Sequence, residues 1–254
     1  MRITRLRFLR LAATVLLATA SGAGATVLDP VGAHDLVKRT ELIFEGVVSD
    51  LQYRVSDVES KDDVALPHTF VTFEIEKTFK GSSAAGRVIT LRFEGGPDPE
   101  RDEILVVHGV PRFDLGERAV VFVEKNSAST CPVTGWEQGR FRVVDGYVFA
   151  EGGQEVWLTT SNQLVFGKTV LLDEMLTHVV DGTPFVLDVG PSEPWTPSVG
   201  IRRASSPEFR KVLSALVKKY FTAEQLAALK PVPSASPKDP LVVKEEKPVP
   251  PPAN

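Results

Sequence analysis

Histidine is the side chain best suited to bind a metal ion or to transfer a proton near neutral pH. This chain has four histidines, at His34, His68, His108 and His178. Metal sites built on a single element place histidines at short intervals, such as His-x-His or His-x-x-x-His, and the sequence contains no such interval. We therefore expect no metal site, and we expect the four histidines to be structural or solvated.

The sequence also lacks the motifs of a nucleophilic active site. The pentapeptide Gly-x-Ser-x-Gly, which presents the serine of many hydrolases, does not occur, and the one cysteine, Cys131, precedes a proline and has no histidine near it. We expect Cys131 to be a loop thiol, with a reactive or intermolecular disulfide role as the alternative. A hydrolase could still assemble its site from distant residues, and the first candidates would then be His68, Glu74, Asp102 and His108.

Two loops resemble ligand-binding motifs but lack residues that are essential for binding. Residues 81–88 have the glycine spacing of a phosphate loop, yet Arg87 stands in place of the lysine and Val88 in place of the magnesium-binding hydroxyl. The acidic stretch 98–103 lacks the spacing of a calcium loop, and Arg101 offsets its charge. We expect neither nucleotide nor calcium binding, and no cofactor.

Aromatic residues gather between positions 136 and 157, where their side chains could stack on a sugar or a peptide. The candidate binding residues are Trp136, Phe141, Tyr147 and Trp157. Core packing is the alternative, because a small β-domain needs bulky side chains that point inward.

The elements that must position these residues are predominantly strands. Residues 68–79 place apolar side chains at every second position over much of their length, which is the period of a strand with one buried face. Asp145 and Gly146 form a tight-turn dipeptide between two apolar runs and predict a β-hairpin. Further strands are expected at residues 42–48, 88–93, 104–107, 119–124, 156–160 and 164–166.

Helices are expected at the two ends of the domain. A short one is predicted over residues 33–40, and Ser206 with Pro207 predicts the start of a longer amphipathic helix. Residues 222–225 have the sequence of a capping box, which predicts a short last helix. Residues 169–180 place apolar side chains on one helical face, so a helix is favoured there too.

Short strands without crossover helices between them indicate a mainly β fold and argue against a doubly wound nucleotide-binding fold. We predict a small antiparallel barrel of the OB-like type, or a sandwich. The short N-terminal helix and the C-terminal helices are expected to pack on it.

We divide the chain into four segments. Residues 1–25, with four arginines ahead of an apolar run, have the composition of a signal peptide. Residues 26–150 are expected to form the β-barrel core, and residues 151–230 a β-hairpin and helical extension of the same domain. Residues 231–254, of which 8 are proline, are expected to be a disordered tail.

The charge balance bears on partners and location. The chain has 29 Lys and Arg against 33 Asp and Glu, and the first 25 residues hold four of the basic residues and no acid, so the remainder carries a net charge of −8. This charge argues against nucleic acid as a partner. The apolar run of the signal is too short to span a bilayer of about 30 Å. We therefore expect no membrane anchor after cleavage, and a periplasmic or secreted protein.

Four blocks of the chain together resemble a loosely defined group of exported bacterial proteins without assigned function. The blocks are residues 35–48, 73–81, 113–123 and 138–143. The first two are also similar in layout to the OB-like barrel of tissue inhibitors of metalloproteinases and netrin modules, in which a leading helix, a strand ending in Gly-x-Val and a strand ending in Phe-Lys-Gly recur. The resemblance implies a barrel-like fold and a binding role.

The chain departs from those inhibitors at the residues that inhibit. The inhibitors chelate the protease zinc with an amino-terminal cysteine, whereas the expected mature start here is Thr26 and Cys131 is the single cysteine. No inhibitory residue can therefore be carried over.

These observations predict an exported, non-enzymatic binding or accessory module that engages a protein, a peptide or a component of the cell envelope. OB-like barrels commonly bind through one sheet face and its loops. Two alternatives stay open: a secreted hydrolase without a recognisable motif, and a structural envelope protein whose proline-rich tail reaches another layer.

Overall fold

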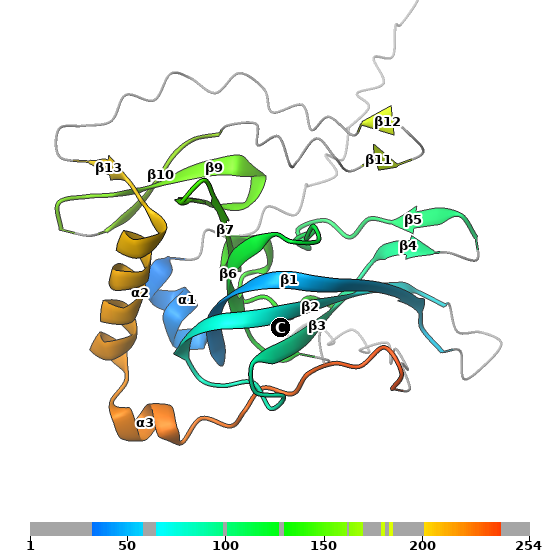
Figure 1. Cartoon of the computed structure of the whole chain (residues 1–254), viewed down its shortest axis with the longest axis horizontal. Helices are drawn as coiled ribbons and strands as arrows, with labels where there is room; N and C mark the ends of the chain where they lie inside the picture. Colours follow the sequence, from blue (N-terminus) through cyan, green and yellow to red (C-terminus); the bar gives the residue numbers. More distant parts are fainter. Residues whose placement is uncertain are drawn as a thin grey trace, which may run out of the picture.

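A computed structural model describes residues 32–57, 65–98, 101–126, 130–161, 163–169, 179–180, 183–184 and 201–239. These residues form a mainly β fold, with one large antiparallel sheet, a short N-terminal helix and C-terminal helices (Figure 1). The main path of the sheet comprises β1 (Leu42–Val55), β2 (Pro67–Lys80), β3 (Val88–Glu94), β6 (Arg118–Val123), β7 (Arg140–Val144), β8 (Tyr147–Phe149), β9 (Gln154–Leu158) and β10 (Leu164–Thr169). A ninth strand, β13 (Arg202–Arg203), pairs with β9.

The remaining elements are two short β-ribbons and the helices. Two small ribbons pair β4 (Gly96–Asp98) with β5 (Glu103–Leu105), and β11 (Val179–Val180) with β12 (Thr183–Pro184). The helices are α1 (Ala33–Arg39), α2 (Ser206–Tyr220) and α3 (Ala223–Ala227), with the 3-10 turns η1 (Trp136–Gly139) and η2 (Glu151–Gly153).

The large sheet is open, so the expected barrel is wrong. Its strand order among the described residues is β10-β9-β8-β7-β6-β1-β2-β3, and the two end strands do not pair with each other. Closure would need a strand on the outer edge of β3, and other groups occupy that edge. The amide of Thr90 donates to the Ser234 hydroxyl over 2.8 Å, that of Arg92 donates to the Asn126 side chain over 3.2 Å, and the Thr90 carbonyl accepts from Ala235 over 2.9 Å.

The long hairpin of β1 and β2 bends because its register shifts at three places. One shift lies at Gly46, where a Cβ atom would stand only 2.6 Å from the carbonyl oxygen of Glu74 on β2. Glycine is therefore required for the two backbones to come this close.

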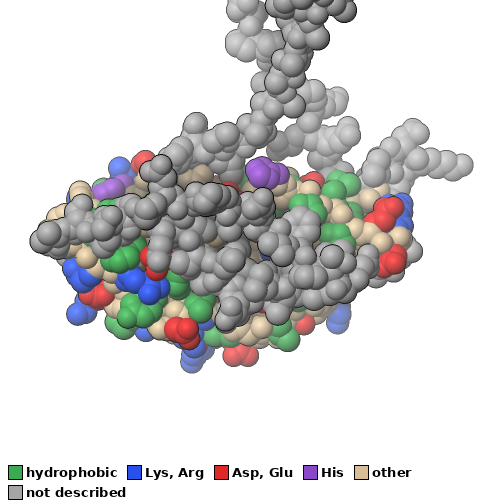
Figure 2. Space-filling model, turned by 90° about the horizontal axis from the view of Figure 1, so that it is seen from above, with side chains coloured by type: hydrophobic (Ala, Val, Ile, Leu, Met, Phe, Trp, Pro, Cys, Tyr) green, Lys and Arg blue, Asp and Glu red, His purple; other side chains and the backbone are tan. Residues whose placement is uncertain are grey.

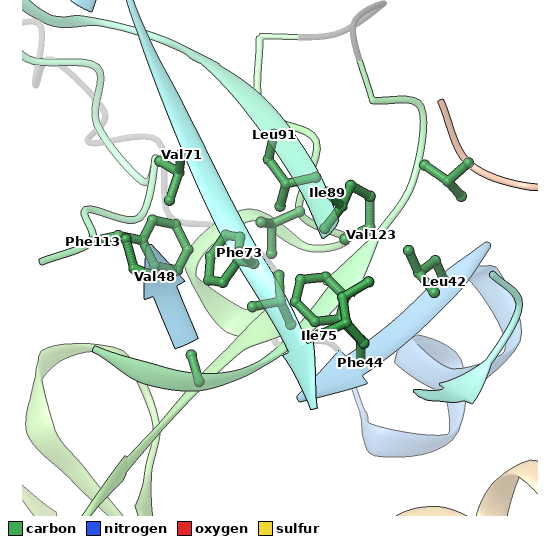
Figure 3. Packing of buried hydrophobic residues seen from close by; sticks show 14 of the residues in the cluster. Leu42, Phe44, Val48, Val71, Phe73, Ile75, Ile89, Leu91, Phe113 and Val123 are labelled. Atoms are coloured by element: carbon green, nitrogen blue, oxygen red, sulfur yellow. The ribbon is translucent and has the colours of Figure 1, made fainter. Parts of the chain in front are cut away.

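Strand alternation gives the sheet two buried faces. Phe44, Phe73 and Leu91 belong to a core on one face of β1, β2 and β3 (Figure 3). On the opposite face, Ile43 and Phe122 belong to a second core that α1 and α2 cover. Strands β1 and β6 are thus buried on both sides, which explains their nearly continuous apolar sequence.

Capping boxes start both C-terminal helices. At α2, the Ser205 side chain and amide bond the Glu208 carboxylate, so the N-cap is Ser205, one residue before the position expected from the sequence. At α3 the box joins Thr222 and Gln225, as expected. No helix in the described ranges is long and apolar enough to cross a membrane.

The first part of the expected disordered tail lies against the domain. Val232 is 1% exposed and packs in the first core, and Arg54 donates to the carbonyl groups of Pro237 and Asp239 over 2.7 and 2.6 Å. Residues 231–239 thus run from the first core past the edge of β3 to the end of β1.

Several predictions concern residues outside those described. The signal peptide over residues 1–25 lies there, as do residues 240–254 of the tail and residues 170–178 of the favoured helix. Of the rest of that favoured helix, Thr169 ends β10, and Val179 and Val180 form β11.

Candidate functional site

A pocket of about 270 Å³ opens where the ends of β1, β2 and β3 meet the β4–β5 ribbon. Tyr53, Thr69 and Phe93 line it from β1, β2 and β3 respectively. Tyr53 pairs with Thr69 and Thr69 with Phe93, and directly paired residues of antiparallel strands point to the same face of a sheet. The pocket therefore lies on the face that carries the first core.

Two glycines allow the chain to turn from β3 into the wall of the pocket. Gly95 and Gly96 have φ angles of +97° and +122°, which side-chain-bearing residues rarely adopt. A Cβ atom on Gly96 would also lie 2.2 Å from the Thr69 hydroxyl. That hydroxyl donates to the carbonyl of Gly95 over 2.8 Å and so fixes the turn.

The interior of the pocket is apolar and its rim is unusually exposed. Val71 and Phe93 are buried at its base, whereas Tyr53, Ile104 and Val106 are 43%, 40% and 61% exposed. Large apolar side chains this exposed around one concavity are typical of binding surfaces.

Phe113 forms one wall of the pocket and belongs to the core behind it. Its ring contacts that of Phe73 edge to face at 5.2 Å between centroids (Figure 3). The Phe113 ring also lies 5.4 Å from that of Phe93. The guanidinium of Arg140 stands 4.6 Å from the centroid of the Phe113 ring. The aromatic wall is therefore fixed by packing and by a cation–π contact.

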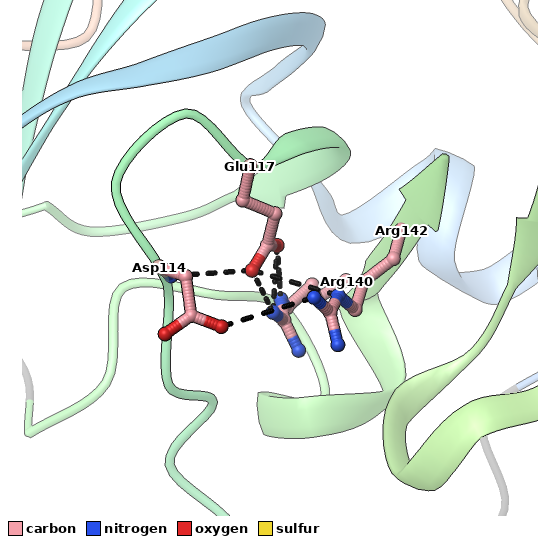
Figure 4. Close-up of polar contacts among 4 residues, drawn as sticks. All are labelled: Asp114, Glu117, Arg140 and Arg142. Carbon is pink, nitrogen blue, oxygen red and sulfur yellow. Dashed lines mark hydrogen bonds and ion pairs between the residues drawn. The ribbon is translucent and has the colours of Figure 1, made fainter. Parts of the chain in front are cut away.

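A buried ionic cluster surrounds that guanidinium (Figure 4). Arg140 donates to the Glu117 carboxylate over 2.6 Å, and both side chains are at most 3% exposed. Arg142 lies 3.5 Å from Glu117 and 3.8 Å from Asp114. Burial raises the pKa of Glu117 above its usual value, and the two guanidiniums oppose that rise. Because the Arg140–Glu117 pair is closed to solvent, we interpret the cluster as structural.

The phenol of Tyr53 is the polar group whose acidity the pocket changes. Burial, and then the negative charge of Asp114, raises the pKa of Tyr53 above its usual value. The hydroxyl therefore stays protonated and can act as a hydrogen-bond donor throughout the neutral range.

The four aromatic residues expected to bind a ligand lie in different surroundings. Phe141 is 1% exposed and packs between Phe122 and Phe209 in the second core. Trp136 is half-buried against the first core.

Tyr147 and Trp157 are the two of these aromatics that share a neighbour. The Arg203 guanidinium lies 4.3 Å from the Tyr147 ring centroid, and Arg203 pairs with Trp157 across β13 and β9. Both Arg203 and the Trp157 indole contact the Glu155 carboxylate, at 3.2 Å each. These contacts hold Tyr147 and Trp157 in place, and none of them involves Phe141 or Trp136.

The residues considered for a hydrolase are not brought together. His68 is 2% exposed, and Glu74 lies six positions further along β2, which is about 20 Å in a strand. Asp102 and His108 are exposed, at the β4–β5 turn and after β5. Among the described residues, no hydrogen bond or ion pair joins any two of the four, and no group of three or more His, Cys, Asp or Glu is arranged to hold a metal ion.

Cys131 is buried rather than poised for reaction. Burial raises the pKa of its thiol to about 12, and the sulfur lies 3.9 Å from the carbonyl oxygen of Val133. A thiol with this pKa contains almost no thiolate at neutral pH, so it is a poor nucleophile.

Sequence reasoning missed the pocket residues, although one signal was present. The sequence Gly95-Gly96-Pro97 directly follows a buried strand, and paired glycines mark a backbone turn that other residues cannot make. The apolar residues 104–107 were expected to be a strand, and only β5 forms there. The residues left beyond β5 form the pocket wall instead.

Seen from above, acidic and basic side chains are interspersed with hydrophobic ones over the described part of the surface (Figure 2). This view shows no extended area of a single charge among those residues.

Neither a scan against protein-family models nor a search of curated proteins found a match for this chain.

Proposed function

We propose that the protein is an exported, non-catalytic binding module that engages an apolar group of a protein, a peptide or a component of the cell envelope. The observation that carries the proposal is the pocket between β3 and the β4–β5 ribbon, with its buried base and exposed apolar rim. Burying apolar surface is the main driving force for such binding, and each buried methylene contributes about 0.8 kcal/mol.

The pocket also has the rigidity that a binding site needs. Its base belongs to the first core, and its wall at Phe113 is fixed by two aromatic rings and by Arg140. A preformed concavity loses little conformational entropy when it takes up a ligand. The separation of His68 from Glu74 along β2 favours binding over hydrolysis.

Binding of the uncharged fluorescent probe N-phenyl-1-naphthylamine tests the proposal. We expect saturable fluorescence enhancement with one site per chain. Replacing two rim residues together, Ile104→Ser and Val106→Ser, removes apolar contact area and should weaken binding roughly tenfold, about 1.4 kcal/mol.

Leu115→Ser is the matched control, because Leu115 is 67% exposed and does not line the pocket. It should leave the dissociation constant unchanged. Absence of saturable binding, or equal loss in both variants, would overturn the proposal.

A further inference from the structure

Arg112 is a charged residue placed beside an otherwise apolar pocket. It lines the pocket next to Phe113, and its side chain is exposed. Among the described residues, Arg112 has no ion-pair or hydrogen-bond partner for its guanidinium. It therefore differs from the other arginines near the pocket, Arg140 and Arg142, whose guanidiniums lie against Glu117 and Asp114.

The acids closest to Arg112 in sequence are already engaged. Asp114 lies 3.8 Å from Arg142, and Glu117 accepts from Arg140. Glu94, whose residue also lines the pocket, follows Phe93 in β3, so strand alternation directs its side chain to the opposite face of the sheet. Among the described residues, the Arg112 guanidinium at the pocket mouth is thus not paired with an acid, and the charge of Asp114 reaches the same rim at Tyr53.

A guanidinium next to apolar walls fits a ligand with a carboxylate on an apolar body. Arginine presents N–H groups in a planar fork that matches the two oxygens of a carboxylate. The protonated hydroxyl of Tyr53, on the same rim, can donate a further hydrogen bond. The volume of 270 Å³ lies just below the range of about 300–1,000 Å³ typical of drug-sized ligands, which indicates a small molecule.

We propose that the pocket binds small apolar carboxylates, with Arg112 recognising the carboxylate and the core-facing walls holding the apolar body. This inference rests on the proposed function, because it assumes that the pocket takes up an apolar group. It adds the chemical class of the ligand and the residue that selects it.

Calorimetric titration with three ten-carbon compounds tests the inference: decanoate, 1-decanol and decylammonium. We expect decanoate to bind about tenfold more tightly than 1-decanol, and decylammonium more weakly than both. Raising the salt concentration should reduce the advantage of decanoate over 1-decanol, because the ion pair is exposed at the mouth.

Variants at Arg112 separate charge recognition from apolar binding. Arg112→Gln should remove the tenfold preference for decanoate and leave 1-decanol binding unchanged. Arg112→Lys, which keeps the charge but not the planar fork, should restore part of the preference. The thermal midpoint of the Arg112→Gln protein should match that of the parent, because the guanidinium forms no hydrogen bond or ion pair with a described residue.

Arg87→Gln is the matched control for net charge. Arg87 is exposed and lies six positions before Phe93, about 20 Å away along the strand direction. It should leave all three affinities unchanged.

The outcomes distinguish the two proposals. If none of the three compounds binds, the proposed function fails. If 1-decanol binds as tightly as decanoate, or if Arg87→Gln lowers decanoate affinity as much as Arg112→Gln, the carboxylate inference is overturned while apolar binding stands.

Discussion

Glu117 and His68 are both buried titratable residues beside the same sheet, yet their surroundings differ in kind. Glu117 is held in a cluster of charges, with Arg140 and Arg142 against its carboxylate. His68 is 2% exposed, and neither of its ring nitrogens has a hydrogen-bond partner among the described residues. Burial and the nearby charge of Arg92 lower the pKa of His68 to about 4.

The comparison separates two ways of burying an ionisable group. A carboxylate can stay charged in the interior when hydrogen bonds and opposite charges replace its water. A histidine without such partners is buried in its neutral form. The folded protein then loses stability only when the pH falls and the unfolded chain binds a proton at the histidine. The first arrangement is sensitive to loss of a partner and the second to acid.

Removing the Glu117 carboxylate should give the largest effect. Glu117→Ala leaves the guanidiniums of Arg140 and Arg142 buried without their main acceptor, and we expect the free energy of unfolding to fall by about 3–5 kcal/mol. Urea denaturation followed by circular dichroism measures the change.

Glu76→Ala is the control for this prediction. Glu76 pairs with Arg118 at the surface, where both side chains are more than a third exposed, and surface pairs contribute about 0–1 kcal/mol. Equal costs for Glu117→Ala and Glu76→Ala would show that the buried cluster has no special role in stability.

His68 should make the protein sensitive to acid. The unfolded chain binds a proton at His68 near the ordinary pKa of 6.5, whereas the folded protein binds it only near 4. Stability is therefore complete above pH 6.5 and is lost as the pH falls toward 4, by about 3 kcal/mol from this residue alone. Urea denaturation between pH 7 and pH 4 measures the loss.

His68→Leu should flatten this pH dependence, since leucine does not titrate and suits a buried position. His108→Gln, at an exposed position, should retain the parental slope. If His68→Leu loses as much stability toward pH 4 as the parent does, His68 is not the source of the acid sensitivity.

Local patterns in the sequence predicted much of the sheet. The alternation over residues 68–79 falls within β2, and the dipeptide Asp145-Gly146 joins β7 to β8. Both signals depend on neighbours within a few residues. The open sheet could not be read in this way, because it depends on Ser234 and Asn126 reaching the edge of β3 from distant parts of the chain.

The candidate site could not be predicted from the sequence for a related reason. Arg140 and Arg142 occupy alternate positions of β7, a pattern that in a sequence indicates a solvated face. In the structure both side chains are buried and form ion pairs with acids more than twenty residues earlier in the chain. The pocket combines the ends of three strands with a segment, residues 106–113, that has no periodicity. Arg112 has no distinguishing pattern around it, so its position beside the pocket emerges only from the fold.

Truncation of the C-terminal segment should give the smallest of these effects on stability. A chain ending at Lys230 loses the buried Val232 and the two carbonyl groups that accept from Arg54, so we expect a loss of about 2 kcal/mol at pH 7. Arg54 pairs with His68 across β1 and β2, and its two acceptors, the carbonyl groups of Pro237 and Asp239, belong to the removed segment, so the truncation exposes the neighbour of His68 on that face. Water should then reach the imidazole, and the pKa of His68 should return toward 6.5.

The truncated protein should therefore be less stable at neutral pH and also less sensitive to acid, as urea denaturation at pH 7 and pH 4 will measure. A chain ending at Val243 is the matched control, because it keeps every contact described for the segment, leaves the Asp239 carbonyl in a peptide bond, and should behave like the parent in both respects. If the chain ending at Lys230 loses stability but keeps the full acid sensitivity, the sheet itself keeps His68 neutral and the segment contributes packing alone. If both truncated chains behave like the parent, the contacts of Val232 and Arg54 with this segment do not stabilise the fold.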